Sequence, residues 1–224
     1  MPKKHQTAIV IPAFNEAATI AGVVNSVKEY GGVIVVDDGS SDGTPELAEK
    51  AGAMVVRQPQ NMGYDKAIQA GMRKATELGF TAAIAIDADG QHPAGKIPEL
   101  LAPLESGEVD MVLTTRPKPA RFTEAIFRRI AKNNYGINDI LCGMKGYRLD
   151  VYKDYDHLYD HPTFATAAPI AAAKDGKRIK QWDIPVSERA DTPRIGRLVK
   201  ANISIFKGMR KALELTKKEA NRHE

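Results

Sequence analysis

Three clusters of polar residues could carry chemistry, and each directly follows a short apolar run. Asp87-Ala88-Asp89 follows residues 82–86, Asp37-Asp38-Gly39-Ser40 follows residues 33–36, and Asn15-Glu16 follows the first apolar run. Side chains two positions apart in an extended segment face the same way, so Asp87 and Asp89 can hold one hard divalent cation. Such a cation, Mg²⁺ or Mn²⁺, would keep waters and bind phosphate oxygens of a ligand. Two solvated or helix-capping aspartates are the alternative interpretation.

The second cluster also has two interpretations. A carboxylate at Asp37-Asp38 could accept hydrogen bonds from a nucleobase or a ribose, while Gly39 permits a tight turn. The plainer interpretation is a turn followed by a helix start, since Ser41 and Asp42 are good capping residues. Both can hold at once, with different residues in each role.

Strands alternate with helices in the first half of the chain, which predicts an α/β fold with a mostly parallel sheet covered by helices on both faces. Pro12 is expected to end the first strand. Ligands bind beyond the carboxyl ends of strands in such sheets, and all three polar clusters lie there. The predicted strands are residues 8–11, 33–36, 53–57, 82–86 and 109–114; the predicted helices are 15–30, 45–51, 63–78 and 95–104.

The second half of the chain is less regular. Its patterns predict helices over 121–135, 163–174 and 197–217, and strands over 143–147 and 178–186. Between them, the tyrosines and Pro162 favour an irregular, solvated segment over a metal-binding helix for the Asp154–His161 cluster, although His157 and His161 have a chelating spacing.

Composition excludes several classes of protein. The chain has 224 residues and a single cysteine, Cys142, so an internal disulfide framework is excluded and a reducing, cytoplasmic location is expected. We expect no signal peptide and no membrane-spanning helix. The net charge of +4 is concentrated in residues 197–224, which leaves the rest nearly neutral and argues against a nucleic-acid partner.

Four motifs, taken in order, resemble the family 2 glycosyltransferases with the GT-A fold. They are Ile11-Pro12-Ala13-Phe14-Asn15-Glu16, Val36-Asp37-Asp38-Gly39-Ser40, Asn61-Met62-Gly63 and Asp87-Ala88-Asp89-Gly90-Gln91-His92-Pro93. The last of these, with Asp139-Ile140-Leu141-Cys142-Gly143-Met144-Lys145, is similar to the dolichyl-phosphate mannosyltransferase and polyprenyl-phosphate glycosyltransferase branch. The resemblance is close over residues 7–116.

The resemblance implies an inverting, metal-dependent transfer of a sugar from a GDP- or UDP-sugar donor to an acceptor, a polyprenyl or dolichyl phosphate. It assigns roles residue by residue. Nucleotide contacts fall on Pro12, Phe14, Glu16, Asp38 and Asp87; the Mg²⁺ or Mn²⁺ on Asp87, Asp89 and Gln91; phosphate contacts on Arg128 or Arg129; and catalysis on Asp89, Arg116, Asp139, Arg189 and Arg194. Taken alone, each arginine is better explained as a surface ion pair.

The acceptor side departs from the family pattern. Arg194 stands where the branch usually has a lysine, and Cys142 where it usually has a serine. Asp139 is the candidate base if the acceptor is a saccharide hydroxyl, whereas a lipid phosphate needs no strong base. A non-catalytic nucleotide-sugar-binding module and a sugar nucleotidyltransferase are the remaining alternatives, and the second lacks the expected Gly-rich loop after the first strand.

The last part of the chain is predicted to be separate from the catalytic domain, with a GT-A domain over residues 1–196 and a basic amphipathic helix over 197–224. Its apolar stripe could lie on an anionic membrane as a peripheral contact, or pack on the domain or on a second subunit in a homo-oligomer.

Overall fold

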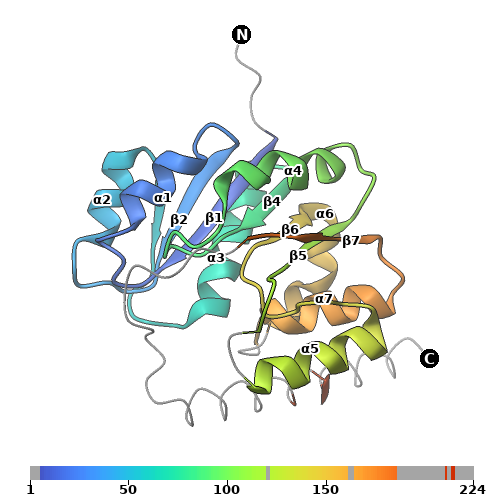
Figure 1. The fold of residues 1–224 in the computed structure, drawn as a ribbon. Coiled ribbons are helices and arrows are strands. Elements are labelled where there is room, and N and C mark those ends of the chain that lie inside the picture. Colours follow the sequence, from blue (N-terminus) through green and yellow to red (C-terminus); the bar gives the residue numbers. More distant parts are fainter. Residues whose placement is uncertain (1–5, 120–121, 161–163, 186–209, 211–212, 215–224) are drawn as a thin grey trace.

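The computed structural model describes residues 6–119, 122–160, 164–185, 210 and 213–214. The fold is an α/β sandwich around one seven-stranded sheet with the strand order β3-β2-β1-β4-β6-β5-β7 (Figure 1). The strands are β1 (Thr7–Ala13), β2 (Gly32–Asp37), β3 (Met54–Arg57), β4 (Ala82–Ala85), β5 (Met111–Thr115), β6 (Lys145–Arg148) and β7 (Ile179–Asp183).

The sheet is parallel except for one inserted strand. β6 runs antiparallel to both of its neighbours, β4 and β5, while β7 is parallel to β5. The predicted mostly parallel sheet is therefore confirmed. The antiparallel direction of β6 was not predicted, because a four-residue strand carries no signal of its orientation.

Helices cover both faces of the sheet. They are α1 (Ile20–Val27), α2 (Thr44–Ala51), α3 (Tyr64–Glu77), the 3₁₀ turn η1 (Ala94–Lys96), α4 (Ile97–Glu105), α5 (Phe122–Tyr135), α6 (Leu149–Tyr152), the 3₁₀ helix η2 (Lys153–Asp160) and α7 (Phe164–Lys174). In Figure 1, α1, α2 and α4 lie above the sheet, and α3, α5 and α7 lie below it.

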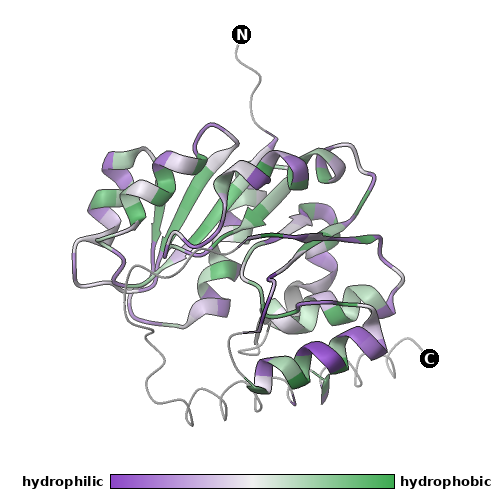
Figure 2. Ribbon diagram, in the orientation of Figure 1, coloured by the Kyte–Doolittle hydropathy of each residue, from purple (hydrophilic) through white to green (hydrophobic). Residues whose placement is uncertain are grey.

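The core is divided by the sheet into two clusters. Alternate residues of β1 belong to opposite clusters: Ala8 and Val10 pack with α3, α5 and α7, whereas Ile9 and Ile11 pack with α1, α2 and α4. In Figure 2 the central strands β1 and β2 are green, hence hydrophobic, whereas the edge strand β7 includes purple, hydrophilic residues. Burial on both faces explains why β1, β2 and β4 read as continuous apolar runs.

Pro12 does not end the first strand, and that prediction was wrong. β1 continues to Ala13, with Pro12 opposite Val36 of β2. Pairing with β4 covers only Thr7 to Val10, and the carbonyl of Ala13 is turned to β2, where it accepts the N–H of Asp38. The missing N–H of Pro12 therefore falls on the β4 side beyond the end of the pairing, where no ladder bond is lost.

Two other predictions need correction. Residues 15–19 form turns rather than the start of a helix, since they are held by hydrogen bonds to the loop after β2. The segment expected to be irregular is helical: α6 and η2 span Leu149 to Asp160, and Tyr152, Tyr155 and Leu158 are buried in the core. Tyr152 and Tyr155 thus belong to the core, and the Tyr155 hydroxyl donates a hydrogen bond to Asp175.

The predicted boundary at residue 196 lies outside the described residues, as does most of the C-terminal helix. Of that helix, Arg210, Leu213 and Glu214 are described, and Leu213 packs against the core cluster beneath the sheet. Among the described residues, no helix is long and apolar enough to cross a lipid bilayer.

Candidate active site

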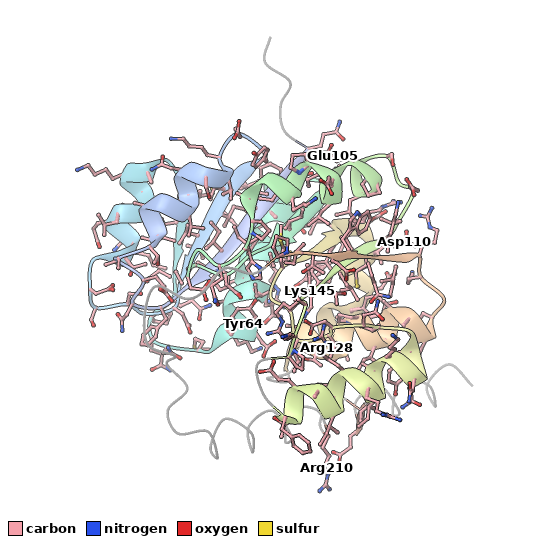
Figure 3. All side chains as sticks on the ribbon, viewed as in Figure 1. Tyr64, Glu105, Asp110, Arg128, Lys145 and Arg210 are labelled. Atoms are coloured by element: carbon pink, nitrogen blue, oxygen red, sulfur yellow. The ribbon has the colours of Figure 1, made fainter. Side chains whose placement is uncertain are left out.

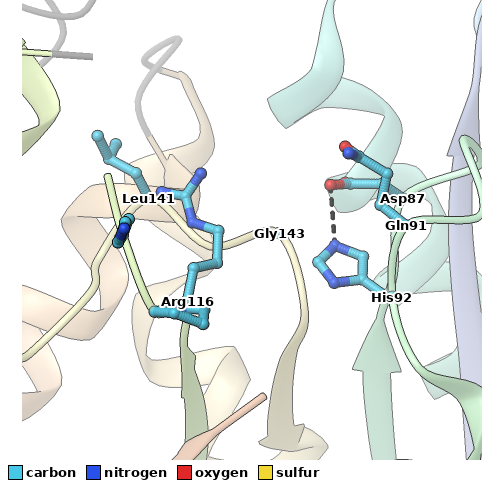
Figure 4. A pocket seen from close by; sticks show the side chains of 8 residues that line it. Asp87, Gln91, His92, Arg116, Leu141 and Gly143 are labelled. Carbon is cyan, nitrogen blue, oxygen red and sulfur yellow. Dashed lines mark hydrogen bonds and ion pairs between the residues drawn. The ribbon is translucent and has the colours of Figure 1, made fainter. Parts of the chain in front are cut away.

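A pocket of about 370 Å³ opens where β4 and β5 end and where the chain approaches β6. One wall carries Asp87, Gln91 and His92, and the facing wall carries Arg116 and Leu141, with Gly143 between them (Figure 4). Pro117 and Lys118 complete the lining. Carboxyl ends of strands from distant parts of the sequence thus meet at one site, as expected for a parallel sheet.

Asp87 is held from two sides. Its Oδ2 lies 3.0 Å from Nε2 of His92, and its Oδ1 accepts a hydrogen bond of 3.0 Å from the hydroxyl of Tyr64. Burial by itself raises the pKa of Asp87, but the His92 ring, the Tyr64 hydroxyl and the nearby Lys145 ammonium outweigh it and lower that pKa. Asp87 is therefore ionised, and its side chain remains one-third exposed to the pocket.

Gly143 makes room for this carboxylate. A Cβ atom at Gly143 would lie 2.3 Å from Oδ2 and 2.5 Å from Oδ1 of Asp87, closer than any real contact. The segment that leads into β6 therefore passes directly against the carboxylate, and only a residue without a side chain fits there.

The residues present fit a hard divalent cation. Asp87 and Gln91 present oxygens to the pocket, and Asp89 lies beside them, where its Oδ1 accepts the backbone N–H of Gln91 at 3.1 Å. Carboxylate and amide oxygens are the ligands that Mg²⁺ and Mn²⁺ prefer. Among the described residues, no group of three or more His, Cys, Asp or Glu side chains is arranged to hold a metal.

The facing wall is built on an ion pair. Nε and Nη2 of Arg116 donate to the two carboxylate oxygens of Asp139 at 2.8 and 3.1 Å, and Nη2 also lies 3.3 Å from Glu124 of α5. Arg128, which is labelled in Figure 3, donates to the backbone carbonyls of Arg116 and Asn138, and its Nη2 lies 3.6 Å from Asp139. Two arginines and two carboxylates thus form one neutral network.

Asp139 has no exposed surface. Burial tends to raise its pKa, but the hydrogen bonds from Arg116 and the charge of Arg128 lower it overall. The Asp139 carboxylate is enclosed and paired with a guanidinium, so it would have to leave this pair to reach an acceptor hydroxyl. The structure therefore gives Asp139 the geometry of a residue that orients Arg116, not that of a base.

The loops predicted to contact the nucleotide are held together by hydrogen bonds from backbone N–H groups to side-chain oxygens. The Asp38 carboxylate accepts the N–H groups of Met62 and Gly63 at 2.7 and 2.9 Å. Asn15 and Glu16 donate their N–H groups to Ser40 and Thr44, so the loops after β1 and β2 form one unit. These hydrogen bonds show that the Asp37–Ser40 cluster forms a structured turn, which is the plainer of its two interpretations. A ligand beside the cluster is compatible with this turn.

The remaining predicted residues differ in their burial and in their position relative to the pocket. Pro12 is buried in β1, while Phe14 and Glu16 are half-buried on the loop that follows it. Of the two candidate arginines on α5, Arg128 faces the site and Arg129 is exposed on the outer side. Arg189 and Arg194 lie outside the described residues.

Four residues of the site were missed as functional candidates by sequence reasoning. Lys118 lines the pocket, and Tyr64 donates a hydrogen bond to Asp87. Gly143 makes room for the Asp87 carboxylate, and Lys145 is buried close by. Nζ of Lys145 donates to the carbonyl of Ala165 at 2.6 Å, and burial lowers its pKa. Gly143 and Lys145 belong to the Asp139–Lys145 motif, and this position in the motif indicates a role in the site. Nothing in the sequence around Tyr64 or Lys118 indicates one.

Comparison with known proteins places this site in a family. The model of "Glycosyl transferase family 2" matches residues 8–167, which includes every described wall of the pocket. The chain belongs to this family. The match spans the strands β1 to β6 and all the polar clusters from which the resemblance was first drawn.

Relatives within the family carry several descriptions. A Haloferax volcanii protein, "Glycosyltransferase AglJ", is 29% identical over 84% of this chain and 64% of its own. A Methanococcus voltae "UDP-N-acetylglucosamine--dolichyl-phosphate N-acetylglucosaminyltransferase" is 31% identical over 62% of this chain and 63% of its own. An uncharacterized glycosyltransferase of Mycobacterium tuberculosis is 38% identical over 81% of this chain and 85% of its own. The matches to the first two span less than two thirds of those relatives' lengths.

Solved structures show the same fold. Glucosyl-3-phosphoglycerate synthase from Mycobacterium tuberculosis, in complex with phosphoglyceric acid, superimposes with a TM-score of 0.73 at 21% identity, covering 92% of this chain and 79% of that one. The predicted GT-A fold is thereby confirmed.

Proposed function

We propose that this protein transfers a sugar from a nucleoside-diphosphate donor to a polyprenyl phosphate, with inversion at the anomeric carbon. The donor would lie along the carboxyl edge of the sheet, with its nucleoside over the loops after β1 and β2. Its diphosphate would meet Asp87, Asp89 and Gln91, and its sugar would point to the Arg116 wall.

The observation that carries this choice of acceptor is the state of the carboxylates. Among the described residues that line the pocket, Asp87 is the only carboxylate, and it belongs to the metal side. Asp139, the candidate base, is enclosed by Arg116. An acceptor that brings its own ionised oxygen, as a phosphate monoester does, needs no base from the protein, whereas a sugar hydroxyl does.

Asp87, Asp89 and Gln91 would hold the Mg²⁺ or Mn²⁺, which when bound supplies charge compensation for the departing diphosphate. The rest of the proposed chemistry belongs to the chain. Tyr64 and His92 fix the orientation of Asp87, and Asp139 fixes that of Arg116. Lys118, which is exposed at the pocket, would bind the acceptor phosphate as a flexible point charge.

The relatives support this proposal in part. Described relatives include a dolichyl-phosphate transferase and an "Undecaprenyl-phosphate 4-deoxy-4-formamido-L-arabinose transferase" of Shewanella sediminis, which is 28% identical over 82% of this chain and 59% of its own. The fold neighbour, glucosyl-3-phosphoglycerate synthase, has been seen with UDP-glucose, Mn²⁺ and the small acid phosphoglycerate. A UDP-sugar is named for the dolichyl-phosphate transferase and for the synthase, whereas their acceptors differ, so the acceptor class is what needs a test.

Donor binding is measured first, by calorimetry with GDP-mannose, UDP-glucose and UDP-N-acetylglucosamine, each with and without Mn²⁺. We expect one donor to bind only with Mn²⁺, and Asp89→Ala to abolish that binding. Asp150→Ala, which removes an exposed carboxylate far from the pocket, is the matched control and should bind the donor normally. A folded protein that binds none of the donors would sink the proposal and favour the non-catalytic alternative.

The acceptor is then tested with a matched pair of lipids, undecaprenyl phosphate and undecaprenol, which differ only in the phosphate. We expect nucleoside diphosphate to be released with the phosphate alone, and Lys118→Ala to raise KM for this acceptor more than it lowers kcat. Equal turnover of the alcohol would show that the protein supplies a base after all. Release of pyrophosphate instead of nucleoside diphosphate would identify a nucleotidyltransferase.

A further inference from the structure

Lys145, labelled in Figure 3, is a cation in the interior of the sheet. It is the first residue of β6, it lies between Ala85 of β4 and Leu113 of β5, and only 4% of its surface is exposed. Its ammonium carries three donors, yet its single hydrogen bond among the described residues goes to the carbonyl of Ala165. Buried charges can often be replaced by apolar residues without loss of stability, so stability alone does not account for a lysine here.

The register of the sheet places Lys145 on the same face as Asp87. Lys145 lies opposite Ala85, so continuing the antiparallel register by two residues sets Gly143 opposite Asp87. The close approach at Gly143 agrees with this, because a Cβ there would lie 2.3 Å from Oδ2 of Asp87. Side chains two positions apart along a strand share a face. Both charged side chains therefore lie on the α3 face of the sheet, from which Tyr64 reaches Asp87.

A bridge through the first turn of α7 holds the ammonium in this place. The N–H of Ala165 donates to Oδ1 of Asp65 in α3 at 2.8 Å, and the carbonyl of Ala165 accepts from Nζ of Lys145 at 2.6 Å. Burial lowers the pKa of Lys145, while the carboxylates of Asp139, Asp65 and Asp87 raise it. The Lys145 ammonium in turn helps to lower the pKa of Asp87. A fixed positive charge thus acts on a carboxylate of the candidate metal site.

Such a charge has opposite effects on the two ligands that the site would take. It repels a divalent cation and attracts a diphosphate, and its burial leaves both effects poorly screened by salt. A divalent cation that is already bound to a diphosphate carries little net charge, so it is repelled far less than the cation alone.

We propose that Lys145 makes the site bind a lone divalent cation weakly and favour the complex of the cation with the donor diphosphate. Asp65, on the other side of Ala165, offsets part of this positive charge. The effect on the diphosphate rests on the proposed function. The effect on the cation alone does not.

Mn²⁺ without nucleotide tests the effect on the cation. Electron paramagnetic resonance measures free Mn²⁺ as it is titrated into the full chain. We expect Lys145→Met, which removes the charge and keeps an unbranched side chain, to tighten Mn²⁺ binding by about tenfold or more. Lys145→Gln should behave in the same way, whereas Lys145→Arg keeps the charge and should bind Mn²⁺ weakly. Lys74→Met, which removes a more exposed lysine in the last turn of α3, should bind Mn²⁺ as the unaltered protein does.

Asp65→Asn should act in the opposite direction. Its amide oxygen can still accept the N–H of Ala165, but a negative charge beside Lys145 is lost, so we expect Mn²⁺ binding to weaken by about threefold or more. UDP or GDP is then titrated by calorimetry at saturating Mn²⁺. There we expect weaker nucleotide binding in Lys145→Met and tighter binding in Asp65→Asn. A variant that only loosens the fold would weaken the binding of both ligands, so opposite signs identify an effect of charge.

Two results would overturn the proposal, each in variants that circular dichroism shows to be folded. One is Mn²⁺ binding in the neutral variants of Lys145 that is no tighter than in the unaltered protein. The other is a shift of the same sign in those variants and in Asp65→Asn. If the unaltered protein binds neither nucleotide, the proposed function fails, and the Mn²⁺ titrations still decide the role of Lys145.

Discussion

The roles of the carboxylates in the site depend more on the side chains around them than on their positions in the sequence. Asp87, Arg116 and Asp139 were all singled out from motifs, and the structure brings the first two to one pocket. The pairing of Arg116 with Asp139 was not predicted, because the two residues are 23 positions apart and no local pattern relates them. That pairing changes the interpretation of Asp139 from a candidate base to a residue that orients an arginine.

Asp139→Asn tests this interpretation. Removing the charge leaves Arg116, whose side chain is 19% exposed, facing a neutral amide, so we expect the free energy of unfolding to fall by about 3 kcal/mol. Urea denaturation monitored by circular dichroism measures it.

Asp150→Asn is the control for Asp139→Asn, since Asp150 also pairs with an arginine but 61% of its side chain is exposed. It should change stability by less than about 1 kcal/mol. An equally small loss of unfolding free energy in Asp139→Asn would mean that the buried Arg116–Asp139 pair does not stabilise this wall of the pocket.

Gly143→Ala tests the close approach of the chain to Asp87. The new methyl group would start 2.3 Å from a carboxylate oxygen, so Asp87 must turn away from His92. We expect Mn²⁺-dependent donor binding to weaken by at least about tenfold while the protein stays folded. Gly95→Ala, at a site with open space around it, should leave donor binding unchanged. Normal binding by Gly143→Ala, measured by the same calorimetry, would show that Asp87 tolerates displacement.

At the scale of elements, the sequence predicted most of the first half of the fold and less of the second. Repeated apolar runs followed by polar clusters specify β1, β2, β4 and β5 and their helices, because these strands are buried on both faces, whereas β3 is a half-exposed edge strand. Pro12 misled the prediction, since its effect depends on how far β4 extends beside it. The α6–η2 region was not predicted to be helical for two reasons. Its buried tyrosines carry polar hydroxyls, and the segment shows no helical period of simple apolar residues.

The packing of α3 on the sheet depends on a small residue. A Cβ at Gly71 would lie 2.3 Å from Cγ1 of Val10 in β1, whereas a Cβ at Gly22 in α1 would meet nothing within 4 Å. We expect Gly71→Ala to destabilise the protein by about 1–3 kcal/mol through overpacking. Gly22→Ala should instead stabilise it by about 0.5–1 kcal/mol, because alanine restricts the unfolded chain. Thermal and urea unfolding of both variants measure the difference, and a change of the same sign in both would contradict this account of the packing.

At the scale of the whole molecule, two ion pairs join strands and loops that are far apart in sequence. Arg116 joins the end of β5 to Asp139, and Arg178, just before β7, donates to both oxygens of Asp110, just before β5. Hydrogen bonds from Arg178 lower the pKa of Asp110, and those from Arg116 lower that of Asp139 against the effect of burial. Both carboxylates are therefore more acidic in the folded chain than in the unfolded one.

Acid stability follows from this difference. A lowered pKa contributes stability that is present above the ordinary value of 3.8 and is lost as the pH falls through the lower value of the folded state. We expect the free energy of unfolding to change little from pH 7 to about pH 5 and to fall steeply below about pH 4. Urea denaturation across this range measures it, and Asp110→Asn should show a shallower fall. An unchanged slope in that variant would exclude the Asp110 pair as a source of acid sensitivity.

The place of β6 in the sheet sets the order in which the chain can fold. β6 is the only strand that touches both β4 and β5 in the described sheet, and it follows β5 by some thirty residues. During synthesis, β1 to β4 can pair and collect α1 to α3 while β5 still has no neighbour to join. Asp87 and Arg116 stand at the ends of β4 and β5, on opposite sides of this late strand. The pocket is therefore completed only after β6 has paired with β4 and β5, and a nascent chain released before residue 145 has four paired strands and no site.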